Sequence, residues 1–167
     1  MRVFCLLVFF AALGLRVVAY ATADAADPAY IGTWQFTGAV PAPWTGAHRA
    51  PANAAHAHFL GKAIVFSAKA VAGPAPFACR APRYALTDVT AGQLFGGAVG
   101  KMRVHDKTPD RIAAGLGFTR APVRTLDTGC AFAFYFVDGS TAQVGLDGFV
   151  YTLKKQVPAT AGLTRLK

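Results

Sequence analysis

The 167-residue chain contains no glutamate and only two serines, Ser67 and Ser140. Neither serine stands in a Gly-x-Ser-x-Gly motif, which presents the nucleophile of many hydrolases. Most of the eight acidic residues, all aspartates, occupy turn-like or helix-capping positions rather than pairs suited to general acid and base catalysis. We therefore predict a non-enzymatic protein without a cofactor. The composition leaves open a Ser, His and Asp triad assembled from distant positions.

A glycine-rich stretch, FGGAVGKM, begins at Phe95. It is similar to a phosphate-binding loop only superficially. The first glycine is misplaced, and Met102 occupies the position at which Ser or Thr would bind magnesium.

Long hydrophobic runs are scarce, and the clear one lies at the N-terminus. Arg2 is followed by an apolar run over residues 3–15 and then by small residues, the pattern of a secretory signal peptide. A membrane span needs about 20 apolar residues, and Arg16 interrupts this run. We predict cleavage after Ala25, or alternatively after Ala23. Residues 1–25 are then a signal peptide and residues 26–167 a single exported β-rich domain, periplasmic or secreted. The alternative is a retained N-terminal anchor.

Cysteine is rare as well. Of three cysteines, Cys5 lies inside the predicted signal peptide, which leaves Cys79 and Cys130. In an oxidising compartment an isolated pair most simply forms one disulfide. Closing a loop of about 50 residues would contribute roughly 4 kcal/mol in the chain-entropy model. A redox role is not expected because the chain has no Cys-x-x-Cys motif.

Negative charge is in short supply, because 17 basic residues face 8 acidic ones. Removal of Arg2, Arg16 and Asp24 with the signal peptide would leave 15 basic and 7 acidic residues, a net charge of +8. Such a field favours an anionic lipid, an acidic polysaccharide or the acidic surface of an envelope protein. Nucleic acid is not the expected partner of an exported protein. The alternative is that the charge only keeps a small domain soluble.

The last third of the chain carries the clearest structural pattern. Three runs of alternating apolar and polar residues are separated by Asp138-Gly139 and Asp147-Gly148. Asp-Gly between such runs is a strong hairpin signal. The pattern predicts a β-meander with one apolar side, which needs a cover. The apolar faces comprise Phe132, Phe134 and Phe136, then Ala142, Val144 and Leu146, then Phe149, Tyr151 and Leu153.

Further strands are expected upstream, where alternation recurs four times. The resulting fold class is mainly β, an antiparallel small barrel or sandwich. These expected strands cover residues 30–36, 62–71, 83–89 and 120–127.

One short helix is expected in the segment TPDRIAAGLGF. Thr108 suits the N-cap, Pro109 the first helical position and Asp110 the first turn, while Gly117 can end the helix. We expect this helix to cover a barrel end or a sheet edge.

Residues 41–60 are rich in Pro and Ala and predict a long loop that contains His48, His56 and His58. If the chain is extended there, His56 and His58 point the same way and can hold one metal ion, with His48 or His105 completing the site. The alternative is that these histidines are solvated.

A second candidate site is the basic segment KMRVHDK. As a strand it would place four basic side chains on one face, suited to phosphate or carboxylate groups, although a solvated outer face gives the same pattern. These side chains are Lys101, Arg103, His105 and Lys107.

The stretch Gly32-Thr33-Trp34, followed by antiparallel strands and a last strand that ends in Lys154-Lys155, resembles the lipocalin and avidin type of barrel. The resemblance implies that Trp34 packs across the barrel floor beneath Lys154 or Lys155. A ligand would then lie inside the barrel.

A longer resemblance, carried by IGTWQFTGAVPAPW, ACRAPRY, TLDTGC and YTLKKQ, is to small exported bacterial proteins of unassigned function. It implies an exported β-rich domain with a bridge between Cys79 and Cys130. It implies no activity.

The two tryptophans are interpreted separately. Trp34 is either a core aromatic residue with a satisfied indole N–H or part of a ligand site. Trp44 lies in a loop, PAPWTG, where it either caps a barrel mouth or stays exposed for a partner.

Together these features predict an exported binding protein for an apolar or anionic small ligand, held inside the barrel or along the basic segment. Trp34, Trp44, Lys101, Arg103, His105 and Lys107 are the predicted contacts. One alternative is a protein-interaction module, such as an inhibitor of a cell-wall-degrading enzyme, that uses residues 41–60. Another is a metal-binding or hydrolytic protein that uses His56 and His58.

Overall fold

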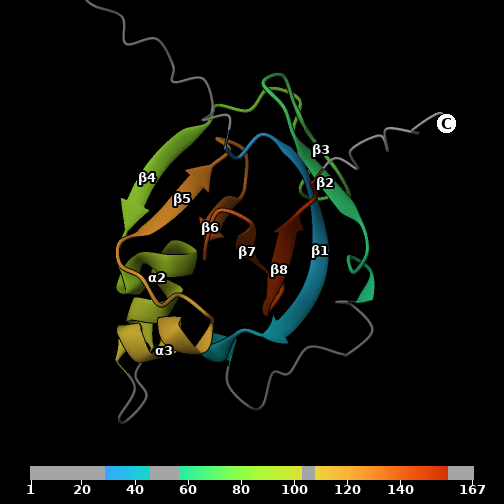
Figure 1. Cartoon of the computed structure of the whole chain (residues 1–167). Coiled ribbons are helices and arrows are strands. Elements are labelled where there is room, and N and C mark those ends of the chain that lie inside the picture. Colours follow the sequence, from blue (N-terminus) through green and yellow to red (C-terminus); the bar gives the residue numbers. More distant parts are fainter. Residues whose placement is uncertain (1–28, 46–56, 103–107, 158–167) are drawn as a thin grey trace, which may run out of the picture.

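The computed structural model describes residues 29–45, 57–102 and 108–157 (Figure 1). Its main feature is one eight-stranded antiparallel sheet. The strands are β1 (Gly32–Pro41), β2 (Ala63–Phe66), β3 (Val71–Ala72), β4 (Ala85–Val89), β5 (Val123–Asp127), β6 (Ala133–Phe136), β7 (Thr141–Leu146) and β8 (Phe149–Lys155). The helices are η1 (Pro43–Thr45), η3 (Ala91–Gln93), α2 (Leu94–Lys101) and α3 (Pro109–Gly115).

The strand order is β3-β2-β1-β8-β7-β6-β5-β4. Each strand therefore pairs with its neighbour in sequence, and β8 returns to pair with β1, but β3 and β4 do not pair. This is the order of an up-and-down barrel that is open between β3 and β4. The sheet curls around a central axis, as Figure 1 shows. The mainly β, barrel-like prediction is confirmed.

The C-terminal meander forms as the alternation predicts. Leu146 pairs with Phe149 across a two-residue turn in which Asp147 and Gly148 have φ of 49° and 80°. Two left-handed residues match the right-handed twist of the flanking strands, which explains the Asp-Gly signal. At the other hairpin, the Asp138 carboxylate accepts hydrogen bonds from the backbone N–H and the hydroxyl of Ser140.

One upstream prediction needs correction. Residues 62–71 do not form a single strand, because the chain turns back between β2 and β3. The Ser67 hydroxyl donates to the Ala70 carbonyl oxygen at 2.8 Å and accepts from the Ala70 N–H at 3.1 Å. A serine that bonds the backbone three residues ahead favours a turn over a continuous strand.

The inner face of the curled sheet is filled by large apolar side chains. Phe66 of β2 meets Phe134 of β6 edge to face, with ring centroids 4.9 Å apart, although these strands are not neighbours in the sheet. The sheet thus covers its own apolar side, and the meander needs no second sheet. The buried side chains of this cluster include Trp34, Phe36, Phe59, Ile64, Phe77, Leu126, Phe136, Val144, Tyr151 and Leu153.

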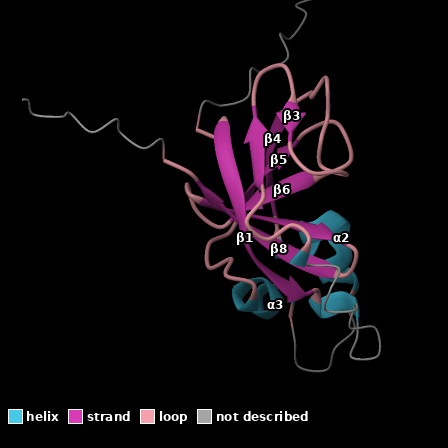
Figure 2. Ribbon diagram, turned by 90° about the vertical axis from the view of Figure 1, so that its right-hand side faces the viewer, coloured by secondary structure: helices cyan, strands magenta, loops and turns pink. Residues whose placement is uncertain are grey.

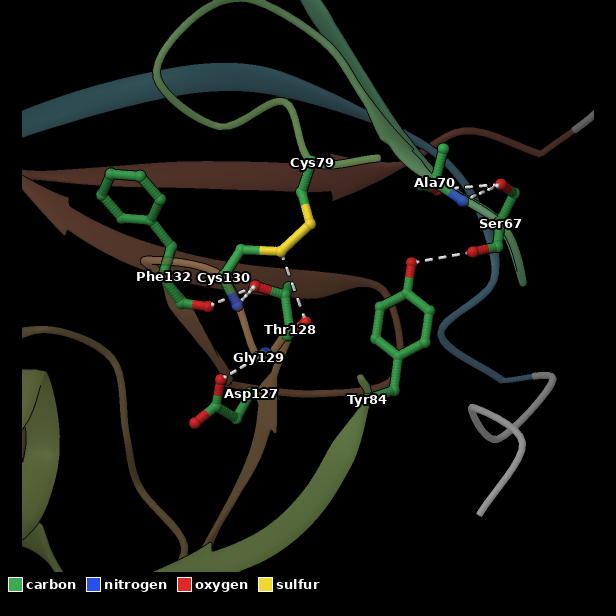
Figure 3. Close-up of a disulfide and its surroundings, with 9 residues drawn as sticks. All are labelled: Ser67, Ala70, Cys79, Tyr84, Asp127, Thr128, Gly129, Cys130 and Phe132. Atoms are coloured by element: carbon green, nitrogen blue, oxygen red, sulfur yellow. Dashed lines mark hydrogen bonds between the residues drawn. A yellow bond between two sulfur atoms is a disulfide. The ribbon is translucent and has the colours of Figure 1, made fainter. Parts of the chain in front are cut away.

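The seam between β3 and β4 is bridged by covalent and polar contacts, of which Figure 3 draws the disulfide and the Tyr84 hydrogen bond. Cys79 exchanges two backbone hydrogen bonds of 2.8 Å with Val71 of β3. Its disulfide to Cys130, in the loop between β5 and β6, joins Cα atoms 6.4 Å apart. The Tyr84 hydroxyl donates to the Ser67 carbonyl oxygen at 2.9 Å. The predicted disulfide is confirmed, and it closes the side of the barrel that has no strand pairing.

Helix α3 begins and ends as the sequence predicts. The Thr108 side chain accepts from the Arg111 N–H at 3.4 Å, Pro109 is the first helical residue, and Gly117 has φ of 96° just beyond the helix. Its buried face meets η3 and α2 in a second apolar cluster that also contains Val123 and Tyr135, which point outward from the sheet. Helices α2 and α3 lie next to each other at the lower left of Figure 1, and Figure 2 shows both toward the lower end of the sheet.

Candidate functional site

A cleft of about 400 Å³ opens beside the β7–β8 hairpin. The walls come from five parts of the chain: η1, the start of α2, the loop that leads into β6, β6 itself, and the β7–β8 hairpin. The lining residues are Trp44, Phe95, Gly96, Ala131, Phe132, Ala133, Tyr135, Gly145, Leu146, Asp147, Gly148 and Phe149.

Three aromatic rings follow one another along one wall of the cleft. The rings of Trp44 and Phe95 have centroids 4.9 Å apart, and those of Phe95 and Tyr135 4.7 Å apart. Trp44 and Phe95 are half-buried, so part of each ring faces solvent. The wall offers a flat, polarisable and partly dry surface of the kind that organic ligands use.

The first turn of α2 places Phe95 in this wall through an unusual backbone. Phe95 has φ of 52° and ψ of 49°, and Gly96 and Gly97 also have positive φ, of 66° and 80°. A left-handed conformation is costly for a residue with a side chain, and such strain is concentrated at ligand-contacting sites. The Tyr135 hydroxyl oxygen accepts a hydrogen bond of 3.1 Å from the Gly96 N–H and so stabilises the turn.

Gly145 of β7 makes room for the two outer rings. A Cβ atom on this residue would lie 3.1 Å from Cδ1 of Phe95 and 3.8 Å from Cζ2 of Trp44. The first distance is shorter than ordinary carbon contacts, so a side chain at Gly145 would displace the Phe95 ring. A glycine within a strand often marks such a close approach.

The cleft carries little charge. Among the described residues that line it, Asp147 is the one ionisable carboxylate, and none is a Lys, Arg or His. Burial raises the pKa of Tyr135 above its ordinary value of 10.0, hydrogen bonds from the backbone of Gly96 and Phe95 lower it, and Asp127 raises it; the net shift is upward. The phenol is therefore neutral at physiological pH. The site suits a neutral ligand with a flat apolar face and does not suit an anion.

Of the two tryptophans, Trp44 lies in the cleft and Trp34 does not. Trp34 has no exposed surface (0%), and its indole N–H donates to the Tyr30 carbonyl oxygen at 3.1 Å. The Nζ atom of Lys155, from the paired position on β8, lies 5.7 Å from the Trp34 ring centroid. Trp34 is thus a core residue out of reach of a ligand in this structure, and the basic residue beside it is Lys155, whereas the Lys154 amine donates to the Thr141 hydroxyl.

The predicted basic strand is wrong at its first residue. Lys101 ends helix α2 and is exposed, so it is not part of a strand. Arg103, His105 and Lys107 lie outside the described residues, and their proposed role in anion binding stays a prediction.

Of the histidines predicted to hold a metal ion, the structure describes only His58. This residue is exposed, and its two ring nitrogens lie 3.2 and 3.4 Å from the Nζ atom of Lys62. His48 and His56 lie outside the described residues. Within the described part of the chain no group of three or more His, Cys, Asp or Glu residues is arranged to hold a metal ion.

Sequence reasoning missed Phe95, Tyr135 and Gly145. A signal for Phe95 was present, because two glycines directly after an aromatic residue favour a left-handed turn. Tyr135 was hidden by its neighbours, since Phe134 and Phe136 define the inner face and leave the residue between them on the outer one.

Comparison with known proteins does not assign this chain to a family. No family model, curated protein or solved structure matches this chain. None of the helices in residues 29–45, 57–102 and 108–157 combines the length and apolar character needed to cross a membrane.

Proposed function

We propose that this protein is an exported binding protein that holds a small, neutral ligand with a flat apolar face in the cleft beside the β7–β8 hairpin. The observation that carries the proposal is the half-buried pair Trp44 and Phe95, which is held open beside Gly145 by a strained turn. Exposed aromatic surface is costly in water, and a strained turn adds to that cost. Binding a ligand there would remove apolar surface from water.

The packing of the inner face supports a ligand on the outside of the sheet. Phe36, Phe66 and Tyr151 are among the side chains that fill the interior and have almost no exposed surface. A ligand inside the curl would have to displace them. The outer cleft requires no displacement, and its volume suits a ligand of one or two rings.

Export is part of the proposal, and the disulfide between Cys79 and Cys130 supports it because such bonds persist in oxidising compartments. The signal peptide over residues 1–25 lies outside the described residues. Intact-mass measurement of the protein from the exported fraction tests the proposal. We expect a chain that begins at Ala26 and is two hydrogens lighter than its reduced form. A chain that retains its first 25 residues in that fraction would contradict cleavage.

The alternative of an enzyme inhibitor that uses residues 41–60 stays a prediction, because residues 46–56 of this loop lie outside the described residues.

Ligand binding is tested with 6-propionyl-2-(dimethylamino)naphthalene, a neutral dye with two fused rings whose emission shifts to shorter wavelength when it leaves water. We expect saturable binding and a change in tryptophan fluorescence, since Trp44 would contact the dye. Gly145→Ala should weaken binding about tenfold, because the new methyl group pushes the Phe95 ring into the cleft. Trp44→Ala should weaken it by a similar factor through the loss of one wall.

Gly115→Ala is the matched control. It adds the same methyl group at a glycine whose Cβ would meet nothing within 4 Å, at the end of α3 and away from the lining residues. This variant should bind as the unchanged protein does. Equal affinities for Gly145→Ala and Gly115→Ala, or the absence of saturable binding, would refute the proposed site.

A further inference from the structure

Two adjoining hollows lie next to the loop that joins α3 to β5. Their volumes are about 350 and 310 Å³. Phe118, Arg120 and Val123 line both hollows, so the two form one groove with Arg120 at their junction. None of these residues lines the cleft at Trp44.

The first hollow has an aromatic wall. The rings of Tyr30 and Phe136 lie with centroids 4.2 Å apart and planes tilted by 46°. Pro122 and Val137 add apolar surface beside them. The hollow can therefore accept a ring against an aromatic and aliphatic surface.

The two arginines that line the first hollow, Arg120 and Arg124, differ in their ion pairs. The Nε atom of Arg124 lies 2.8 Å from Oδ1 of Asp88, which offsets one cation. The Asp138 carboxylate already accepts two hydrogen bonds from Ser140, of 2.7 and 2.9 Å. Arg120 is exposed and makes no ion pair with any other described residue. Within residues 29–45, 57–102 and 108–157, the Arg120 guanidinium at the edge of the apolar hollow thus has no carboxylate partner.

The second hollow differs from the first. It is lined mainly by small apolar residues of η3, α3 and the following loop, among them Ala113 and Ala114, and it carries Asp110 in the first turn of α3. Its described lining residues include no aromatic pair, and Arg120 is the single basic residue among them beside the Asp110 carboxylate. An anion with an aromatic body is therefore better accommodated by the first hollow.

We propose that this groove is a second binding site, for a small amphipathic monocarboxylate, with the carboxylate on the Arg120 guanidinium and the aromatic body in the hollow beside Tyr30 and Phe136. The planar fork of arginine matches the two oxygens of a carboxylate. The single positive charge of the Arg120 guanidinium matches the single negative charge of a monocarboxylate. The excess of basic residues, 17 against 8, attracts anions toward the surface.

The experiment follows backbone amide NMR signals while 1-naphthoate is added to the protein. We expect a Kd in the millimolar range or tighter, with shifts of the Arg120, Val123 and Gly139 amides and none at Gly145. 1-Naphthamide, which has the same shape and no charge, should bind at least about tenfold more weakly, because it lacks the charge-assisted hydrogen bonds. An absence of shifts at millimolar naphthoate, or equal binding of the amide, would overturn the proposal.

Variants separate the local contact from the general charge. Arg120→Gln should weaken naphthoate binding about tenfold or more. Arg80→Gln removes the same charge from an exposed position outside the groove and should leave binding within about twofold. Equal losses in the two variants would show a nonspecific attraction and exclude the site.

The position of the aromatic body has its own test. Ala114→Leu adds volume in the second hollow only and should leave naphthoate binding unchanged. A loss in this variant would contradict the placement beside Tyr30 and Phe136. Trp44→Ala should also leave it unchanged, because no described residue lines both the cleft and the groove. Failure of this site and failure of the proposed function are therefore distinguishable.

Discussion

The Tyr84 hydroxyl donates a hydrogen bond of 2.9 Å to the Ser67 carbonyl oxygen, and this bond joins the start of β4 to the turn between β2 and β3. Strands β3 and β4, which flank these two positions, are the edges of the sheet and do not pair with each other. A side chain thus replaces part of the missing backbone ladder. Figure 3 draws this hydrogen bond in the surroundings of the disulfide.

Tyr84→Phe should destabilise the protein by about 1 kcal/mol, because it removes this bond and leaves the Ser67 carbonyl oxygen without that donor. The free energy of unfolding in urea measures the effect. The phenyl ring keeps the apolar contacts of Tyr84 with the core, so the change isolates the hydroxyl. A variant as stable as the unchanged protein would show that water replaces the hydroxyl at no cost.

Replacement of Cys79 and Cys130 by alanine should cost roughly 2–4 kcal/mol, because the disulfide closes a loop with a sequence separation of 51. The midpoint of urea unfolding, with and without a reductant, measures it. The reductant should destabilise the unchanged protein and leave the double-alanine variant unaffected. Destabilisation of the variant by the reductant would contradict the disulfide as its target.

Alkaline pH should destabilise the fold through buried tyrosines. Burial raises the pKa of Tyr135 and Tyr151 above 10.0, with Asp147 adding to the effect at Tyr151. The unfolded state therefore loses these protons at a lower pH than the folded state does. The resulting stability is fully present below pH 10.0 and is lost as the pH rises through the folded-state pKa values.

Thermal unfolding between pH 8 and 11, about the ordinary pKa of tyrosine, checks this expectation. Tyr151→Phe should show a shallower alkaline decline than the unchanged protein, since one titrating phenol is gone. An equally steep decline in this variant would assign the alkaline effect to other groups.

Most of the sheet could be predicted from local patterns. Alternation places Phe134 and Phe136 on the inner face, and Asp147-Gly148 fixes a hairpin, because both signals act within a few residues. The short strand β3 was not separated from β2, since a turn stabilised by one serine hydroxyl leaves only a faint mark in the sequence.

The candidate site was predictable only at Trp44. Its partners Phe95 and Gly145 stand far from Trp44 in the sequence, and only the curl of the sheet brings them together. The seam between β3 and β4 could not be predicted either. Alternation of apolar and polar residues indicates that strands form, but it does not indicate which two consecutive strands fail to pair. Contacts between distant segments depend on the whole fold, which a single sequence does not encode in any local pattern.

The pairing of Trp34 in β1 with Lys155 in β8 also determines when the sheet can be completed during folding. During synthesis β1 is among the first strands to emerge, but one of its two neighbours is the last strand of the sheet. Until β8 is complete, β1 keeps one edge open and its large side chains lack half of their cover. The sheet therefore completes its tertiary structure only after β8 has been made, and until then the chain stays open to chaperones and to aggregation.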